Sequence, residues 1–255
     1  MKKNFPIVIA ILFLIAAGFY FQKLIRQGIA DSLFNRGNYY FNESSWAKGG
    51  TFTRESTQIY DLDKAQNRFE WALRVFPQAQ GPHYQLARIY FLKADFSRAL
   101  NEINTEIQNF PDFKRSYYVR GLINGYAKNF PEAIADFEEF LKWDSQSWAA
   151  HNDLAWIYFQ TGDYENAEKI SREGLKWNPD NPWLLNSLGT ALLNLGDKKQ
   201  AKIVLEQALR EAQKLTPSDW QRAYPGNEPG IAEEVLKKMV ENIEFNLNLA
   251  TTVDK

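Results

Sequence analysis

The sequence predicts an all-α solenoid of about five repeated helix pairs, preceded by an apolar helix and closed by an amphipathic one. Three observations predict this fold. They are an apolar run near the N-terminus, a 34-residue repeat through the middle of the chain, and apolar residues at every fourth position near the C-terminus. A fixed period of this size is typical of repeat proteins, in which each unit packs on its neighbours.

Composition narrows the class of partner. The chain of 255 residues has a formal net charge of −1, and residues 1–26 contain four basic residues and no acid, which leaves −5 for the remainder. A mildly acidic array without a basic run argues against nucleic acid as a partner. The chain contains no cysteine, so disulfides and Cys-ligated metal sites are excluded.

The apolar run near the N-terminus extends from Phe5 to Phe21 and is interrupted only by Pro6 and Gly18. Seventeen helical residues span about 26 Å, and extension to Ile25 supplies enough length to cross a bilayer. We therefore expect a short basic cytoplasmic tail at residues 1–4 and a single-pass transmembrane anchor at residues 5–25.

Two other interpretations of this run remain open. A cleaved signal peptide fits the basic start, but the run is longer than a usual apolar region of that kind. The nearest small-residue cleavage pattern, at Gly28-Ile29-Ala30, lies inside a predicted repeat helix. A buried core helix is the weaker alternative for a run that is apolar on every face.

Flanking charges predict the orientation of the anchor. Lys2 and Lys3 precede the run and Lys23 and Arg26 follow it, so the count of positive charges is nearly balanced. The short basic start resembles that of bacterial signal anchors. We expect a bacterial inner-membrane protein whose repeat array lies on the periplasmic side.

Four consecutive segments begin 34 residues apart, at Gln80, Lys114, Trp148 and Pro182. Small residues at the eighth and twentieth positions allow two helices to approach closely, and Asp or Asn at the sixteenth position is suited to cap the second helix. The eighth position holds Ala87, Gly121, Ala155 and Gly189; the twentieth holds Ala99, Ala133, Ala167 and Ala201; the sixteenth holds Asp95, Asn129, Asp163 and Asp197.

These residues resemble the tetratricopeptide repeat (TPR) family, whose unit is a helix–turn–helix of 34 residues. The segment that begins at Trp148 is the closest match, and it departs from the family pattern at His151 and at Ser171, where Phe or Tyr is usual. The resemblance implies a TPR-type right-handed superhelical solenoid whose concave face is lined by the first helix of each unit.

The resemblance also sets the predicted boundaries. An altered first copy has Gly37 at position 8 and Ala65 at position 20, 28 residues apart where the family has 12, so it contains an insert. Near the C-terminus, Ile231, Val235, Met239, Ile243 and Leu247 predict an amphipathic helix that caps the array. The predicted units are TPR 1 at 30–79 with an inserted loop at 43–58, TPR 2 at 80–113, TPR 3 at 114–147, TPR 4 at 148–181, TPR 5 at 182–215, an irregular connector at 216–230 and a capping helix at 231–250.

In the family, positions 2, 5, 9 and 12 of the first helix point into the concave groove. Mapped here, they imply a peptide-binding groove that combines aromatic rings with amides and arginines, a lining suited to peptide side chains and main chain. The alternative is that several of these aromatics are buried between repeats or under the C-terminal helix. The implied groove residues are Phe34, Asn38, Phe41, Tyr84, Arg88, Phe91, Arg115, Tyr118, Asn152, Trp156, Phe159, Trp183 and Asn186.

One known ligand mode of the family is not expected. Some TPR proteins bind a chaperone's C-terminal carboxylate through a Lys/Asn/Arg clamp, and here Phe34 and Val119 occupy two of the four clamp positions. Neither side chain supplies the charge that the clamp requires.

No catalytic or metal constellation is recognisable. The two histidines, His83 and His151, occupy the same repeat position, which a shared structural slot explains. Phosphate-binding loops, nucleophile elbows and zinc motifs are absent from the sequence. We therefore expect no enzyme activity, cofactor or metal, and a membrane-anchored scaffold or assembly factor that binds peptide segments of other proteins. A cytosol-facing receptor for precursor or targeting segments is one alternative, and an enzyme with an unrecognised site near the 43–58 insert is another.

Overall fold

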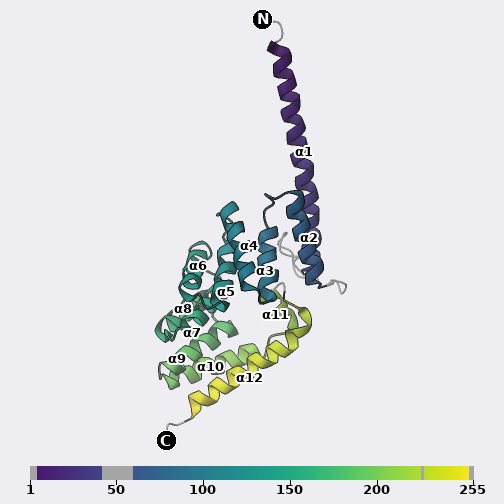
Figure 1. Cartoon of the computed structure of the whole chain (residues 1–255). Helices are drawn as coiled ribbons and strands as arrows, with labels where there is room; N and C mark the ends of the chain where they lie inside the picture. Colours follow the sequence, from purple (N-terminus) through teal and green to yellow (C-terminus); the bar gives the residue numbers. More distant parts are fainter. Residues whose placement is uncertain (1–4, 42–59, 225–226, 253–255) are drawn as a thin grey trace. The chain divides into compact units, whose positions relative to one another are not determined.

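The computed structural model describes residues 5–41, 60–224 and 227–252, and for residues 5–13 it describes the backbone alone. The described residues form twelve α-helices and a short 3-10 helix, with no strand, so the all-α prediction is confirmed (Figure 1). The chain divides into two compact units, Met1–Ile89 and Tyr90–Lys255. The predicted tail at 1–4 and insert at 43–58 lie outside the described residues.

Unit 1 is built around a 36-residue helix, α1 (Phe5–Tyr40). The sequence predicts an anchor ending near residue 25 and a separate repeat helix from residue 30, whereas the structure joins them. The reason is local, because residues 22–29 contain no proline and only one glycine to end a helix. Among the residues whose side chains the structure describes, no helix is both long enough and apolar enough to span a membrane. The start of the predicted anchor, residues 5–13, is outside that set.

The second half of α1 packs along α2 (Leu62–Val75), and the start of α3 (Pro82–Leu92) follows a short turn. Gly37 of α1 faces the ring of Phe69 so closely that a Cβ there would clash. This is the close approach of two helices expected from a small residue at position 8 of a repeat. The split first copy therefore packs as a helix pair although its two helices are far apart in sequence.

Unit 2 contains consecutive helix pairs, each helix packing on the next (Figure 1). Two buried clusters form its core, one centred on Phe137 and Ile157 and the other on Leu188 and Leu205. The helices are α4 (Phe96–Asn109), α5 (Arg115–Tyr126), α6 (Phe130–Trp143), α7 (Trp148–Gln160), α8 (Tyr164–Trp177), α9 (Pro182–Asn194) and α10 (Lys198–Ala212), followed by α11 (Pro217–Ala223), the 3-10 helix Pro229–Ile231 and α12 (Ala232–Thr251).

Helix caps follow the repeat. The side chains of Asp95, Asp163 and Asp197 accept backbone N–H groups of the first turn that follows, at 3.0, 3.1 and 3.0 Å, as the sequence predicts. Asn129 is the exception, because its side chain makes no cap bond. Its amide instead donates to Asn124 Oδ1 at 3.3 Å.

Small residues set the spacing of the two helices in a pair. A Cβ on Gly121 would lie 3.1 Å from the Phe137 ring, and one on Gly189 would lie 2.5 Å from Leu205 Cγ. In the pair α7–α8, Ala155 occupies the position that Gly121 and Gly189 occupy in their pairs. Ser171 occupies the position of Phe137 and Leu205, and its side chain is smaller than theirs.

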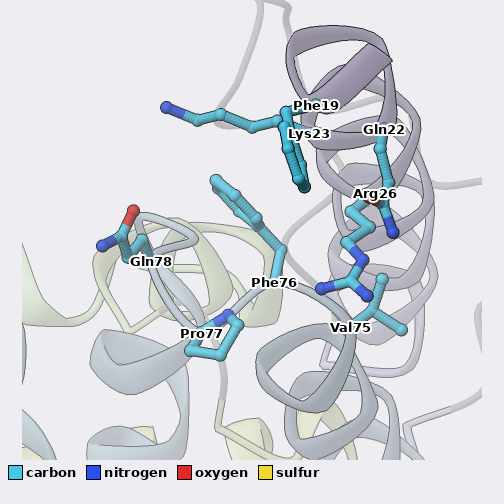
Figure 2. A pocket seen from close by; sticks show the side chains of 8 residues that line it. All are labelled: Phe19, Gln22, Lys23, Arg26, Val75, Phe76, Pro77 and Gln78. Carbon is cyan, nitrogen blue, oxygen red and sulfur yellow. The ribbon is translucent and has the colours of Figure 1, made fainter. Parts of the chain in front are cut away.

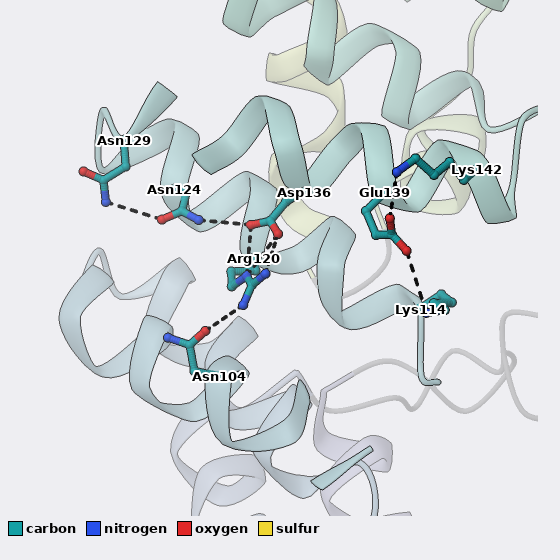
Figure 3. A network of polar contacts seen from close by, with 8 residues as sticks. All are labelled: Asn104, Lys114, Arg120, Asn124, Asn129, Asp136, Glu139 and Lys142. Atoms are coloured by element: carbon teal, nitrogen blue, oxygen red, sulfur yellow. Dashed lines mark hydrogen bonds and ion pairs between the residues drawn. The ribbon is translucent and has the colours of Figure 1, made fainter. Parts of the chain in front are cut away.

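A polar network joins α4, α5 and α6 (Figure 3). The Arg120 guanidinium donates from Nη2 to Asp136 Oδ1 at 2.7 Å and from Nε to both carboxylate oxygens, while Asn124 donates to Asp136 Oδ2 at 3.1 Å. Arg120 also donates to Asn104 Oδ1 at 3.0 Å. The buried Asp136 carboxylate is thus satisfied by a cation and an amide, so we assign this network to helix packing.

The C-terminal segment is more ordered than the sequence predicts. The predicted irregular connector contains α11, which begins with Pro217 and has a capping box between Thr216 and Asp219. Trp220 of α11 is 4% exposed. Beyond it, α12 packs mainly on α10 and also contacts α9, burying Ile243 in their shared core. The helix α11 forms because its caps are local and its Trp is buried.

Candidate functional site

An aromatic row lies on the first helices of the pairs in unit 2. The Tyr126 ring, at the end of α5, lies 5.1 Å from the ring of Phe91 and 5.0 Å from that of Trp156 on α7. Tyr126 is 53% exposed. The sequence predicts Phe91 and Trp156 as groove residues and misses Tyr126, which follows position 12 of its repeat. The three rings form a surface that is open to solvent at its centre.

Asp153, which the sequence analysis does not single out, is a half-buried carboxylate next to this row. Its Oδ2 accepts a hydrogen bond from the Tyr118 hydroxyl at 2.6 Å, and its Oδ1 accepts one from Asn152 at 3.5 Å. Burial raises the pKa of Asp153 to about 6, against the lowering effect of these two bonds. Burial also raises the pKa of Tyr126 and of Tyr224, and the Asp153 charge raises both further, so both phenols lie near this carboxylate.

The predicted amides of the groove bond within the chain. Asn152 Oδ1 accepts from the Ser187 hydroxyl at 2.9 Å. On α9, Asn186 Oδ1 and Thr190 Oγ1 accept from the amide of Asn246 in α12, at 3.4 and 3.1 Å. The Asn186 amide therefore lies against the C-terminal helix.

Trp183 also lies against the C-terminal segment. It stacks on Trp148 of α7 at 5.1 Å between ring centroids and meets the edge of Tyr224 at 6.0 Å. Tyr224 in turn packs on Trp220 of α11 at 5.7 Å. Four aromatic side chains from α7, α9 and the α11 segment thus form one cluster, and each of them is less exposed than Tyr126 at the centre of the row.

The remaining predicted residues of unit 2 have mixed surroundings. Tyr118 packs on the rings of Phe137 and Phe140 at 5.7 and 5.3 Å, in addition to its bond to Asp153. Phe159 packs on Tyr164 of α8 at 5.5 Å, and Arg115 is half-buried in the first turn of α5. These contacts fix the side chains between or within repeats.

In unit 1 the predicted groove residues contact one another. The Gln85 amide donates to Asn38 Oδ1 at 2.8 Å and accepts from Arg88 at 3.0 Å. The Arg88 guanidinium lies 4.8 Å from the Phe41 ring centroid and 5.6 Å from that of Tyr84. Phe41 is fully buried. Phe34, the fifth predicted residue of this unit, packs on Phe69 at 5.6 Å. These contacts join α1 to α2 and α3, and the structure places Phe41 in the core.

A second candidate site is a pocket in unit 1 of about 380 Å³, between α1 and the turn after α2 (Figure 2). Two basic side chains, Lys23 and Arg26, reach it from one face of α1, and the Phe19 and Phe76 rings line it between them. From the sequence, Lys23 and Arg26 are predicted only as charges that flank the apolar run. The complete lining is Phe19, Gln22, Lys23, Arg26, Val75, Phe76, Pro77 and Gln78.

Among the described residues, no group of three or more His, Asp or Glu is placed to hold a metal ion. His151 is buried in α7 with its Nδ1 2.8 Å from the Ser147 carbonyl oxygen. This contact ties the ring to the start of its own helix.

Comparison with known proteins identifies the class. Two family models described as tetratricopeptide repeat match residues 61–112 and 118–182, and residues 162–224, which together are more than half of the chain. The chain therefore belongs to the tetratricopeptide repeat family. Among curated proteins it is similar to anaphase-promoting complex subunit 3 of Schizosaccharomyces pombe, 23% identical over 138 residues. That match covers 54% of this chain and 21% of the relative, so the chain spans about a fifth of that protein's length.

Solved structures share the fold at low sequence identity. Pseudomonas aeruginosa pilF matches with a TM-score of 0.60 and 14% identity over 88% of this chain and 92% of its own. MamA from Desulfovibrio magneticus RS-1 matches with a TM-score of 0.58 and 14% identity, and the match covers 75% of this chain and 96% of MamA. The protein TTC0263 of Thermus thermophilus matches with a TM-score of 0.54 and 18% identity, and the match covers 72% of this chain and 91% of TTC0263. These likenesses support the solenoid of helix pairs.

Proposed function

We propose that this protein is a membrane-anchored scaffold or assembly factor that binds peptide segments of partner proteins on the first helices of its repeats. Family membership supports the coarser part of this role, because tetratricopeptide repeats mediate protein–protein interaction. The observation that carries the finer part is the aromatic row Phe91–Tyr126–Trp156 beside Asp153.

An exposed aromatic surface next to a carboxylate is suited to a peptide. Rings supply large apolar contact area, and the carboxylate and its hydrogen-bonding neighbours offer polar contacts that fix orientation. The amides of α9 already bond to α12. The proposed contact surface is therefore centred on α5 and α7, and the role requires binding without catalysis.

The anchoring part of the proposal is supported by the exposed side chains of α1. Large apolar residues on all sides of this helix are exposed, with Leu14 and Phe19 at 69%. Exposure of contiguous apolar surface is unfavourable in water, and a bilayer is the environment that fits a helix apolar on every face. The exposed set is Leu14, Ile15, Phe19, Tyr20, Phe21, Leu24, Ile25 and Ile29.

Affinity purification of the full chain from solubilised membranes tests the binding role. Tyr126→Asp places a charge in the aromatic row and should weaken binding of a specific partner about thirtyfold or more, which corresponds to the loss of about 2 kcal/mol that defines an interface hot spot. Trp143→Asp is the matched control, since Trp143 of α6 is an equally exposed aromatic, at 56%, outside the row. Equal recovery with both variants, at unchanged helicity, would remove the support for this surface.

We further propose that the anchor lies in a bacterial inner membrane with the repeats on the periplasmic side. Because the chain has no cysteine, one introduced at the exposed position Lys176 of α8 is a unique label. A membrane-impermeant maleimide should modify it in cells with a permeabilised outer membrane and an intact inner one. Labelling only after the inner membrane is opened would favour the cytosol-facing receptor instead.

A further inference from the structure

The pocket at the foot of the apolar helix has the charge of an anion site. Lys23 and Arg26 are three residues apart and therefore share one face of α1, and both reach the pocket (Figure 2). Neither forms an ion pair with an acid in the part of the chain that the structure describes. The volume of the pocket, about 380 Å³, is within the range of small-molecule sites.

Apolar surface continues from this pocket along α1. Phe19, which lines the pocket, belongs to the exposed apolar set, and Lys23 follows the last ring of the apolar run, Phe21, by two residues. Two residues of helix are about 3 Å, so the basic pair lies directly beside exposed apolar surface, which continues past it at Leu24, Ile25 and Ile29. A ligand that meets both features has an anionic group joined to an apolar part.

We propose that this pocket binds the phosphate headgroup of an anionic membrane phospholipid, with Lys23 and Arg26 as its counter-ions and the Phe19 and Phe76 rings against the glycerol and upper acyl chain. This inference rests on the proposed membrane anchor. It goes further by assigning a lipid class to the site and by making the turn after α2 part of the lipid contact.

Charge and position together favour a lipid. Phosphate oxygens are acceptors that Lys and Arg bind strongly, and basic side chains beside a membrane surface attract anionic lipids. The carboxyl end of α2 adds a partial negative charge nearby, but Arg74 in its last turn and the two full charges on α1 outweigh it. A free phosphate ion would use the two cations and leave the rings without a role.

Flotation of the full chain with vesicles tests the anchor and the headgroup site separately. Vesicles of phosphatidylcholine alone report the anchor, because insertion of an apolar helix does not require lipid charge. Short-chain phosphatidylglycerol and phosphatidylcholine, titrated onto the detergent-solubilised full chain, report the headgroup site. We expect phosphatidylglycerol to bind about thirtyfold more tightly, which corresponds to about 1 kcal/mol for each cation.

Variants identify the residues. The pair Lys23→Gln and Arg26→Gln should abolish the preference for phosphatidylglycerol while flotation persists, and the matched pair Lys169→Gln and Lys176→Gln on α8 should retain it. Flotation with phosphatidylcholine vesicles, together with equal affinity for the two lipids in the detergent titration, overturns the headgroup site and leaves the anchor intact. Failure to float with the phosphatidylcholine vesicles overturns the anchor and this inference with it. Full competition by inorganic phosphate at the concentration of the lipid would assign the pocket to a free anion and overturn the lipid.

Discussion

Replacement of Gly189 by alanine tests the close helix contact that the repeat depends on. The new methyl carbon would lie 2.5 Å from Leu205 Cγ and 2.6 Å from its Cδ2. Ordinary contact between carbon atoms is about 3.5–4.0 Å, so Leu205, which is fully buried, has to shift by about 1 Å. Overpacking of this kind costs about 1–3 kcal/mol, against a gain of about 1 kcal/mol in helix propensity. We expect a net loss of about 1 kcal/mol.

A double-mutant cycle with Leu205→Ala separates these effects. Leu205→Ala alone should cost about 2–5 kcal/mol through the cavity that it leaves. In that background the methyl group of Gly189→Ala enters the vacated space and should stabilise the protein by about 1 kcal/mol. The coupling energy is then about 1–3 kcal/mol.

Urea unfolding of the full chain in detergent, followed by circular dichroism at 222 nm, measures the cycle. The control combines Gly189→Ala with Ile243→Ala, which removes another fully buried side chain of the same core that is not among the atoms nearest the new methyl. This control pair should be close to additive. Additivity in the Leu205 cycle as well, to within about 0.5 kcal/mol, would refute the close-contact explanation of the small residue at position 8.

Three further outcomes are expected from the structure. Asp136→Ala leaves Arg120 without its ion pair and should cost about 1–3 kcal/mol, less than a fully buried pair because the Arg120 side chain is 27% exposed; no loss in urea unfolding would contradict the network. Burial raises the pKa of Asp153 in the folded chain from its usual value of 3.8 to about 6. As pH rises, the carboxyl therefore loses its proton in the unfolded chain before it does so in the folded one, and the contribution of Asp153 to stability falls between about pH 4 and pH 6. Asp153→Asn keeps an acceptor for Tyr118 and should therefore gain about 1–3 kcal/mol relative to the native chain between about pH 4 and pH 7, and a pH-independent difference would count against it. Trp220→Ala should release α11, seen as faster amide hydrogen exchange in that helix while α5 to α8 remain protected.

The repeat was predictable from sequence because its signals are local or strictly periodic. Asp95, Asp163 and Asp197 cap the helices that begin next to them, and this chemistry depends on neighbours three residues away. Glycine at position 8 marks the close helix contact at Gly121, Gly189 and Gly37, the last in the split first repeat. Periodicity of this kind determines fold class without knowledge of tertiary contacts.

The candidate sites were predicted less completely. Phe91 and Trp156 occupy groove positions of the family and were therefore predicted. Tyr126 follows groove position 12 of its repeat by one residue, and Asp153 follows the groove residue Asn152 by one residue, so neither was predicted. An acid in the apolar first helix of the fourth repeat was a visible signal for Asp153. Phe41, also in the predicted groove, is fully buried in unit 1, and the Arg88 guanidinium lies 4.8 Å from its ring centroid.

By itself the sequence determined the all-α class, the 34-residue repeat, the helix caps and the position of the apolar run, because each depends on residues within one or two turns or on a fixed period. Only the tertiary structure decided which groove residues stay accessible, since Asn246 contacts Asn186 from 60 residues away and α11 places Tyr224 against Trp183. It also decided that Lys23 and Arg26 share a pocket with the turn after α2. Such contacts join segments whose separation in the sequence carries no periodic or capping signal, and packing of the folded chain alone brings them together.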